Sequence, residues 1–279
     1  KKILINIINA RITKKTFKRW MLFPKTSGKI FSLFNLCLTS NSETKYYLSK
    51  LSAKNIHSYG NIKLINKINE KKIKNPNAKF LLKNKFWLAA STHEGEEYFC
   101  LQTHLILKKR FKSMITIIAP RHISRVQNIK RVCEKLKLNV QILKKNELIL
   151  DDKEIIIINS FGVLPIYYKY SKSVFIGKSI LKKLEEVSGQ NPIDAAKLGC
   201  KVYHGPYVYN FKEVYEILEK NNITKKINSP LELGNNLEQD FNKMNKADNQ
   251  ITHSINRLGQ KILVDTMKYV NKFLMNEIK

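Results

Sequence analysis

One stretch of the chain, SGQNPIDAAKLGCKVYHGPYVYNF (residues 188–211), gathers chemically useful residues around the predicted start of a helix. Asn191 suits the helix cap, Pro192 suits the first turn, and Asp194 lies within that turn. The free N–H groups of a helix start attract anions, so a phosphate can dock there while Asp194 accepts hydrogen bonds from sugar hydroxyls. A helix start without any ligand would use the same residues, so this stretch leaves both interpretations open.

The motif APRH (residues 119–122) follows a predicted strand and carries a cation that folding alone does not explain. Pro120 ends the strand, and Arg121 lies where the next helix is expected to begin. A guanidinium binds phosphate well, but a cation at a helix start opposes the helix dipole. Because stability would favour an acid at this position, the sequence favours an anion-binding role for Arg121.

The motif ASTHEGEE (residues 90–97) also follows a predicted strand. Ser91 and Thr92 are expected to cap the following helix, whose positive end suits the nearby glutamates. Capping explains neither the histidine nor the glycine of this loop, which leave a polar lip. We therefore interpret four residues as lining the cleft: Ser91, Thr92, His93 and Glu94.

The motif NSFGVLP (residues 159–165) is a third loop of this kind. Its glycine, Gly162, lets the backbone approach a ligand closely, although a lone glycine in a loop is a weak signal.

Short apolar runs that alternate with helical segments predict a parallel sheet covered on both faces. The expected strands are 1–8, 33–40, 56–60, 86–91, 113–120, 139–143, 154–160, 173–177 and 201–205. The expected helices are 13–33, 42–51, 95–109, 121–137, 163–170, 191–198, 211–220 and a helical remainder that opens with the capping box SPLE at 229–232. Ligands of such sheets bind outside the carboxyl ends of the strands, where each of these loops lies.

The chain of 279 residues is long enough for two domains, and a hydrophobic content of 43% indicates a globular protein. Lys and Arg number 51 against 22 Asp and Glu, a net charge of +29 that indicates anionic partners in general. Lysine is spread along the whole chain, so the charge alone identifies no function. Cys37, Cys100, Cys133 and Cys200 lie far apart, which excludes a disulfide frame and a zinc site and is typical of packing cysteines.

No apolar run reaches the length of about 18 residues that a spanning helix needs. The chain begins at Lys1 inside an apolar run, KKILINII, which leads us to expect an N-terminal truncation.

The motifs occur in an order and spacing that resembles the 3-deoxy-D-manno-octulosonic acid (Kdo) transferases, the lipid A glycosyltransferases of Gram-negative bacteria. The matching motifs are INARIT (8–13), GNIK (60–63), ASTHEGEE (90–97), APRH (119–122), GQNPIDAAKLGC (189–200) and HGPYVYNF (204–211). The resemblance implies an α/β fold of GT-B architecture, two Rossmann-like domains of which the first is only partly present. It further implies the end of the acceptor-binding domain at 1–62, a linker at 63–77, the nucleotide-sugar domain at 78–260 and a helix that crosses back at 261–279.

The resemblance also implies roles for residues that match the family's motifs. It assigns the transition-state-stabilising lysine to Lys63, and contacts with CMP to Pro120, Arg121, Phe161, Gly162, Val163, Asn191, Pro192, Ile193 and Asp194. The family's catalytic carboxylate and its membrane-anchoring N-terminus lie upstream of the matched region, so no residue here is assigned as the base.

Four positions depart from the family's pattern. Asp194 replaces the usual Glu, and Val163 replaces the usual acid of its loop, which leaves that position only a backbone role. Lys178 and Glu186 replace smaller residues in the loop before Asn191.

The implied reaction transfers Kdo from CMP-Kdo to a hydroxyl of a lipid A precursor, lipid IVA. No cluster of His, Asp or Glu has metal-ligand spacing, so we expect neither a metal nor a cofactor. The expected partners are CMP-Kdo, the lipid A precursor and an anionic membrane surface, with no nucleic acid. The expected location is the cytoplasmic face of the inner membrane, peripheral or through an N-terminal anchor outside this sequence.

Two alternatives remain at this point. Another GT-B enzyme with a UDP-sugar donor would share the fold and most of the motifs. A basic nucleic-acid-binding protein would share the charge, but the sequence has no helix-turn-helix or zinc pattern, and its aromatic residues are not interleaved with basic ones.

Overall fold

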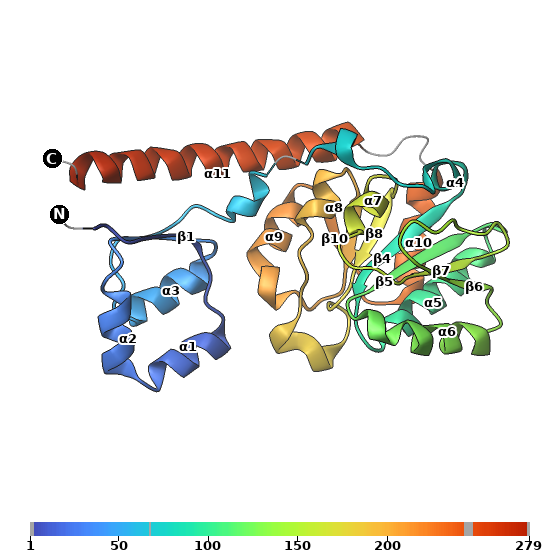
Figure 1. Ribbon diagram of the computed structural model, residues 1–279, viewed down its shortest axis with the longest axis horizontal. Coiled ribbons are helices and arrows are strands. Elements are labelled where there is room, and N and C mark those ends of the chain that lie inside the picture. The colour runs from blue at the N-terminus through green and yellow to red at the C-terminus, as the bar shows by residue number, and fades with distance from the viewer. Residues whose placement is uncertain (1–2, 67, 243–247, 278–279) are drawn as a thin grey trace. The chain divides into compact units, whose positions relative to one another are not determined.

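The computed structural model describes residues 3–66, 68–242 and 248–277, and divides the chain into two compact units (Figure 1). Unit 1 comprises Lys1–Lys67 together with Asn256–Lys279, and unit 2 comprises Ile68–Ile255. Every pair of neighbouring strands in both units is parallel, which confirms the predicted α/β class.

Unit 1 contains a three-stranded sheet in the order β1-β2-β3. The strands are β1 (Asn6–Ala10), β2 (Leu36–Thr39) and β3 (Ile56–Ser58). The helices are α1 (Lys14–Met21), α2 (Pro24–Phe31), α3 (Ser42–Lys50), the 3-10 helix η1 (Ile62–Leu64) and most of α11 (Asp248–Glu277). The residues 13–33 were predicted to be mainly helical, and this is confirmed. The helical stretch divides into α1 and α2 because Pro24, which has no N–H to donate, takes the first position of α2.

The helix α11 packs on unit 1 through its own apolar face. Phe273 lies in a cluster with Leu36 and Leu38 of β2. The hydroxyl of Tyr269 contacts Nε2 of His57, and the centroids of these two rings lie 4.1 Å apart. Burial of apolar side chains and this polar contact together explain why the end of the chain returns to the unit that begins it.

Unit 2 contains a seven-stranded sheet in the order β10-β9-β8-β4-β5-β7-β6. The strands are β4 (Phe86–Thr92), β5 (Ile115–Pro120), β6 (Val140–Leu143), β7 (Ile155–Ile158), β8 (Ser173–Ile176), β9 (Lys201–His204) and β10 (Thr224–Lys226). The α-helices are α4 (Ala78–Lys83), α5 (Glu96–Lys108), α6 (Val126–Lys135), α7 (Leu164–Tyr168), α8 (Ile193–Lys197), α9 (Lys212–Lys220) and α10 (Pro230–Asn242). The 3-10 helices are η2 (Glu70–Lys72), η3 (Ile123–Arg125), η4 (Lys182–Val187) and η5 (Tyr209–Phe211).

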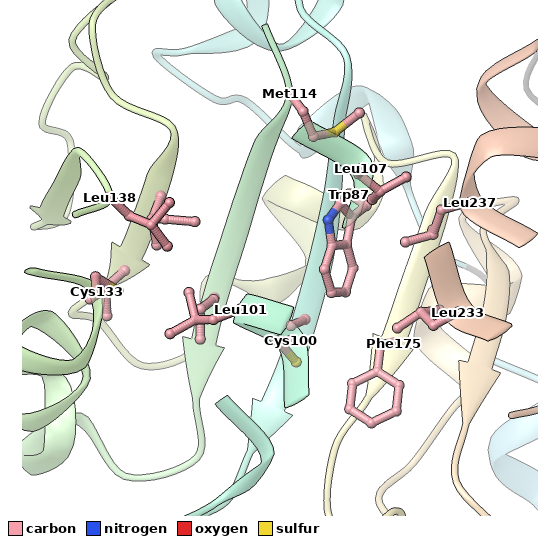
Figure 2. Packing of buried hydrophobic residues seen from close by; sticks show 14 of the residues in the cluster. Trp87, Cys100, Leu101, Leu107, Met114, Cys133, Leu138, Phe175, Leu233 and Leu237 are labelled. Carbon is pink, nitrogen blue, oxygen red and sulfur yellow. The ribbon is translucent and has the colours of Figure 1, made fainter. Parts of the chain in front are cut away.

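Helices cover both faces of this sheet, with α5 and α6 on one side and α7 and α8 on the other (Figure 1). On the first side, Trp87 and Phe175 point from the strands toward Leu101 of α5 and Leu237 of α10 (Figure 2). The carboxylate of Asp240 on α10 accepts hydrogen bonds from Ser173 and Tyr203. The central strands are therefore buried on both faces and rigidly placed, which is what a site at their ends requires.

Four element predictions were wrong in position or missed. The strand expected over 1–8 begins only at Asn6, the helix expected over 121–137 begins at Val126, and that over 191–198 begins at Ile193. The strand β10 was not predicted, because its residues Thr224, Lys225 and Lys226 show no apolar run.

All four cysteines are buried, as expected for packing residues. Burial raises the pKa of the Cys37 thiol to about 11 and that of Cys133 to about 12. Within the described residues, no helix combines the length and the apolar character that crossing a bilayer requires. The same residues contain no group of three or more His, Cys, Asp or Glu side chains arranged to hold a metal ion.

Candidate functional site

The carboxyl ends of β5, β4 and β8 lie side by side, with β4 in the middle. The N–H of Arg121 after β5 donates to the carbonyl of Thr92 at 3.0 Å. On the other side, the N–H of Gly177 after β8 donates to the carbonyl of Ala90 at 2.8 Å. The three loops that follow these strands therefore form one continuous edge.

The loop after β8 is fastened to this edge by a single buried carboxylate. Glu96 at the start of α5 accepts hydrogen bonds from the N–H groups of His93, Lys178, Ser179 and Ile180 at 2.6–3.2 Å. Its side chain has no exposed surface, and burial raises its pKa while these four N–H groups lower it. Glu96 thus fixes the backbone of the site, a role that the sequence did not reveal.

The start of α5 differs from the prediction for Ser91 and Thr92. Gly95, not a hydroxyl residue, is the N-cap of α5, and no side chain caps it. The hydroxyl of Thr92 instead donates to Glu97 at 2.9 Å, and Glu97 forms a two-pronged ion pair with Arg125. Ser91 adopts a left-handed backbone with φ of 57° inside β4, where the pairing with β5 shifts register between Ala90 and Thr92.

Arg121 lies on the surface at this edge, two residues before η3 and five before α6. The prediction that it occupies a helix start was wrong, because Pro120 remains in β5 and the chain extends through His122 before it turns. The argument from the helix dipole therefore does not apply to Arg121. Arg121 nevertheless follows directly after β5, as predicted.

A second cation, Lys178, lies beside this edge and was noted from the sequence only as a departure from the family's pattern. Burial lowers the pKa of Lys178, and the charge of Arg121 lowers it further, while Glu96 opposes both. Burial also lowers the pKa of His93, whose ring lies 5.7 Å from that of His122. Among the described residues, neither Arg121 nor Lys178 forms an ion pair with a carboxylate. This edge therefore carries two cations that form no direct ion pair within the described part of the chain.

The segment before α8 returns to the same edge. The N–H of Gly189 donates to the carbonyl of Lys178 at 2.7 Å, and the hydroxyl of Ser188 accepts from the N–H of Tyr209 at 3.0 Å. Gly205, which follows β9, packs so tightly on Ser179 that an added Cβ would lie 2.1 Å from the carbonyl oxygen of Ser179. Only glycine fits there.

The helix near Asn191 is shorter than predicted and begins later in the chain. Pro192 occupies the N-cap position, and α8 runs for only five residues from Ile193. The side chain of Asn191 accepts the N–H of Ile193 at 3.1 Å, so Asn191 does satisfy a backbone donor, though from outside the cap. Pro192 and Ile193 are buried, whereas Asp194 is exposed.

The loop after β7 occupies the edge next to β5. Phe161 is exposed, Val163 is half-buried, and Gly162 has a φ of 72° with open space around it. The structure thus places Arg121, the 91–94 loop, Lys178 and the Asn191 segment in one contact network, and Phe161–Val163 beyond the neighbouring strand.

Lys63 lies in unit 1, in η1, and its side chain is exposed. Its N–H donates to the side chain of Asn61 at 3.0 Å, which fixes the backbone at this position. The remaining predicted site residues all belong to unit 2.

A cavity of about 680 Å³ lies at the opposite, amino-terminal edge of the unit 2 sheet. Phe86, which begins β4, and Lys172, which precedes β8, line it. None of the predicted site residues lines this cavity. We place the candidate site at the carboxyl edge because ligands of parallel sheets bind there.

The chain is similar to known proteins of one kind. Residues 1–66 match a family model described as 3-Deoxy-D-manno-octulosonic-acid transferase (kdotransferase). A 3-deoxy-D-manno-octulosonic acid transferase of Rickettsia prowazekii is 25% identical, over 96% of this chain and 59% of its own length. These matches confirm the resemblance that the order of motifs indicated.

Two solved structures confirm the fold. The C-terminal CMP-Kdo binding domain of WaaA from Acinetobacter baumannii matches with a TM-score of 0.54 at 20% identity, over 66% of this chain and 91% of that one. Anabaena Alr3699/HepE in complex with UDP matches with a TM-score of 0.59 at 10% identity, over 99% of this chain and 72% of that one. The predicted GT-B architecture is thereby confirmed. The chain spans 50–59% of the length of the curated relatives from Haemophilus influenzae and Rickettsia prowazekii.

Proposed function

We propose that this chain, which resembles Kdo transferases along most of its length, is part of a glycosyltransferase that moves Kdo from CMP-Kdo to a lipid A precursor, lipid IVA. The observation that carries the proposal is the cationic edge of unit 2, where Arg121 and Lys178 flank the end of β4 and neither forms an ion pair with a carboxylate of the described residues. A nucleotide-linked sugar acid is an anion that such an edge attracts.

In the proposed reaction, a hydroxyl oxygen of the acceptor forms a bond with the anomeric carbon of Kdo. The bond between that carbon and the phosphate oxygen of CMP breaks, and its electron pair stays on the phosphate. Negative charge therefore grows on the leaving group, and fixed positive groups near it lower the barrier. In unit 2, the side chain of Arg121 is the group we assign to this phosphate.

The proton of the attacking hydroxyl passes to a general base. The resemblance assigns no such residue in this chain. The chain spans only 50–59% of the length of the relatives from Haemophilus influenzae and Rickettsia prowazekii. We therefore propose that the base comes from the remainder of the full-length protein, and that this chain alone has no transferase activity. The resemblance further leads us to propose that Lys63 stabilises the transition state.

We also propose that the protein works at the cytoplasmic face of the inner membrane. The corner between α1 and α2 exposes Leu22 by 72% and Phe23 by 67%, and Lys18 and Lys25 lie on either side of it. Residues 1–42 contain no Asp or Glu. Exposed apolar side chains within a purely basic segment suit contact with an anionic lipid surface.

Nucleotide preference tests the proposal against the main alternative, a UDP-sugar donor. In the full-length protein, CMP is expected to raise the melting temperature more than UMP at equal concentration, because bound ligand stabilises the folded state. A larger effect of UMP would favour the alternative. Binding to arbitrary DNA that CMP does not compete with would instead favour a nucleic-acid-binding protein.

A further inference from the structure

Lys178 has an unusual backbone for its residue type. It follows Gly177 at the end of β8 with a φ of 59°, in the left-handed region that favours glycine. Glycine would satisfy this conformation without strain, so the fold gains nothing from a side chain here. A strained position at the edge of a candidate site is a reason to ask what its side chain does.

The backbone groups of Lys178 hold the loop, and the side chain does not. The N–H of Lys178 donates to Glu96 at 2.6 Å, and its carbonyl accepts from Gly189 at 2.7 Å. The residue is half-buried, and its ammonium group has no ion pair or hydrogen bond among the described residues. A lysine whose ammonium group has no protein partner is available for a ligand.

The positions of the two cations match a ligand with two separate charges. Arg121 follows β5 and Lys178 follows β8, with β4 between them, so their backbones lie roughly 10 Å apart, twice the strand spacing of about 4.8 Å. Long side chains from these two positions can converge on neighbouring groups or hold groups several ångströms apart. CMP-Kdo has two such groups, the phosphate of CMP and the carboxylate of the sugar acid.

We infer that Lys178 is a further donor-binding residue that contacts the carboxylate of the donor's sugar acid, while Arg121 binds the phosphate. The inference rests on the proposed function. The division follows from the two side chains: a planar guanidinium suits the several oxygens of a phosphate, and a compact ammonium suits a single carboxylate. Lys178 thereby adds a contact with the sugar acid that the smaller residue typical of the family cannot make at this position.

The test compares two ligands that differ by the sugar acid, using the full-length protein. Steady-state kinetics give the KM for CMP-Kdo, and competition gives the inhibition constant for CMP. For Lys178→Gly we expect a KM for CMP-Kdo that rises by roughly tenfold or more, the loss of one charge-assisted hydrogen bond. The inhibition constant for CMP should stay within about twofold, since CMP lacks the carboxylate. Arg121→Ala should raise both values.

Two control variants separate charge from backbone effects. Lys137→Gly relieves a left-handed lysine with a φ of 55° after α6 and should change neither constant. Lys178→Arg keeps a cation and should recover most of the affinity for CMP-Kdo. Melting temperatures confirm that each variant is folded.

Three outcomes would overturn the inference. An unchanged KM in Lys178→Gly shows that the side chain does not touch the donor, while the proposed function stands. Equal weakening of CMP and CMP-Kdo shows that it does not read the carboxylate. A parent protein that neither binds CMP nor uses CMP-Kdo refutes the proposed function itself.

Discussion

At the scale of single residues, the backbone and the side chain of Arg121 have different roles. Its N–H completes the junction with Thr92, whereas its guanidinium lies at the surface. We predict that Arg121→Ala leaves the free energy of unfolding within about 0.5 kcal/mol, the usual range for surface substitutions. The binding free energy for CMP should fall by roughly 1.5–3 kcal/mol, the value of a hydrogen bond to a charged group. Calorimetric titration with CMP measures this, and unaltered affinity would refute the assignment.

Asp194 provides a second prediction for single residues. It is exposed in the first turn of α8, where a carboxylate favours the helix by about 0.3–1 kcal/mol. Asp194→Asn keeps the shape and removes the charge. If Asp194 accepts hydrogen bonds from the ribose, this variant loses affinity for CMP well beyond its small loss of stability, and Asp194→Glu is tolerated. A variant that binds CMP like the parent but has a slightly lower melting temperature would show that Asp194 only stabilises the first turn of α8.

Single residues also show where sequence reasoning stopped. Lys178 is a chemically useful residue in an unremarkable loop, and only the contact of Gly177 with the end of β4 reveals that it lies beside Arg121. Glu96 was interpreted as a helix-start acid, because its four bonds to distant N–H groups require the fold. Conversely, the strand-end positions of Pro120 and Gly162 followed directly from apolar runs that end in turn residues.

At the scale of elements, α10 shows how a local signal stabilises the core. The capping box predicted at 229–232 forms in part: Ser229 Oγ accepts the N–H of Glu232 at 3.1 Å, whereas Glu232 accepts the N–H of Asn228, one residue before Ser229, at 2.8 Å. We predict that Ser229→Ala lowers the free energy of unfolding by about 0.5–2 kcal/mol. Urea denaturation measures it, and Ser229→Asp, which retains an acceptor, should lose far less.

The contact between α11 and β3 predicts a dependence on pH. Burial lowers the pKa of His57, the nearby Lys45 lowers it further, and the neutral ring contacts the hydroxyl of Tyr269. A histidine with a lowered pKa in the folded state stabilises above its ordinary value of 6.5, and this stability is lost as the pH falls through the lowered pKa. We expect amide hydrogens of α11 to exchange faster, relative to intrinsic rates, at pH 5.5 than at pH 7.5. A His57→Gln variant, which cannot charge, should lose this difference.

Sequence reasoning missed or misplaced elements whose local sequence pattern does not match the structure that forms. The strand β10 is an edge strand with two exposed lysines, so it carries no apolar pattern, and only pairing with β9 defines it. The start of α8 was placed too early, because Asn191 followed by Pro192 matches a helix start although the helix begins at Ile193. Central strands such as β7, with four consecutive isoleucines, needed no tertiary information.

At the scale of the whole molecule, the distribution of charge predicts how the protein meets a membrane. We expect the full-length protein to co-sediment with vesicles of phosphatidylglycerol and phosphatidylcholine, and the bound fraction to fall as salt rises. Lys18→Glu with Lys25→Glu should reduce binding, and Leu22→Ser with Phe23→Ser should reduce it independently of salt. Lys135→Glu with Lys137→Glu, two exposed positions on unit 2, serves as the charge-matched control. Equal binding by all variants would place the contact elsewhere.

The buried cysteines give each unit its own chemical reporter. Cys37 lies in unit 1 and Cys133 in unit 2, and with thiol pKa values of about 11 and 12 both react negligibly at neutral pH while folded. Modification by a maleimide therefore has to wait for the surrounding unit to open. Mass spectrometry of the modified peptides over time would yield two opening rates from one unaltered sample, and would show whether the units unfold together or in sequence.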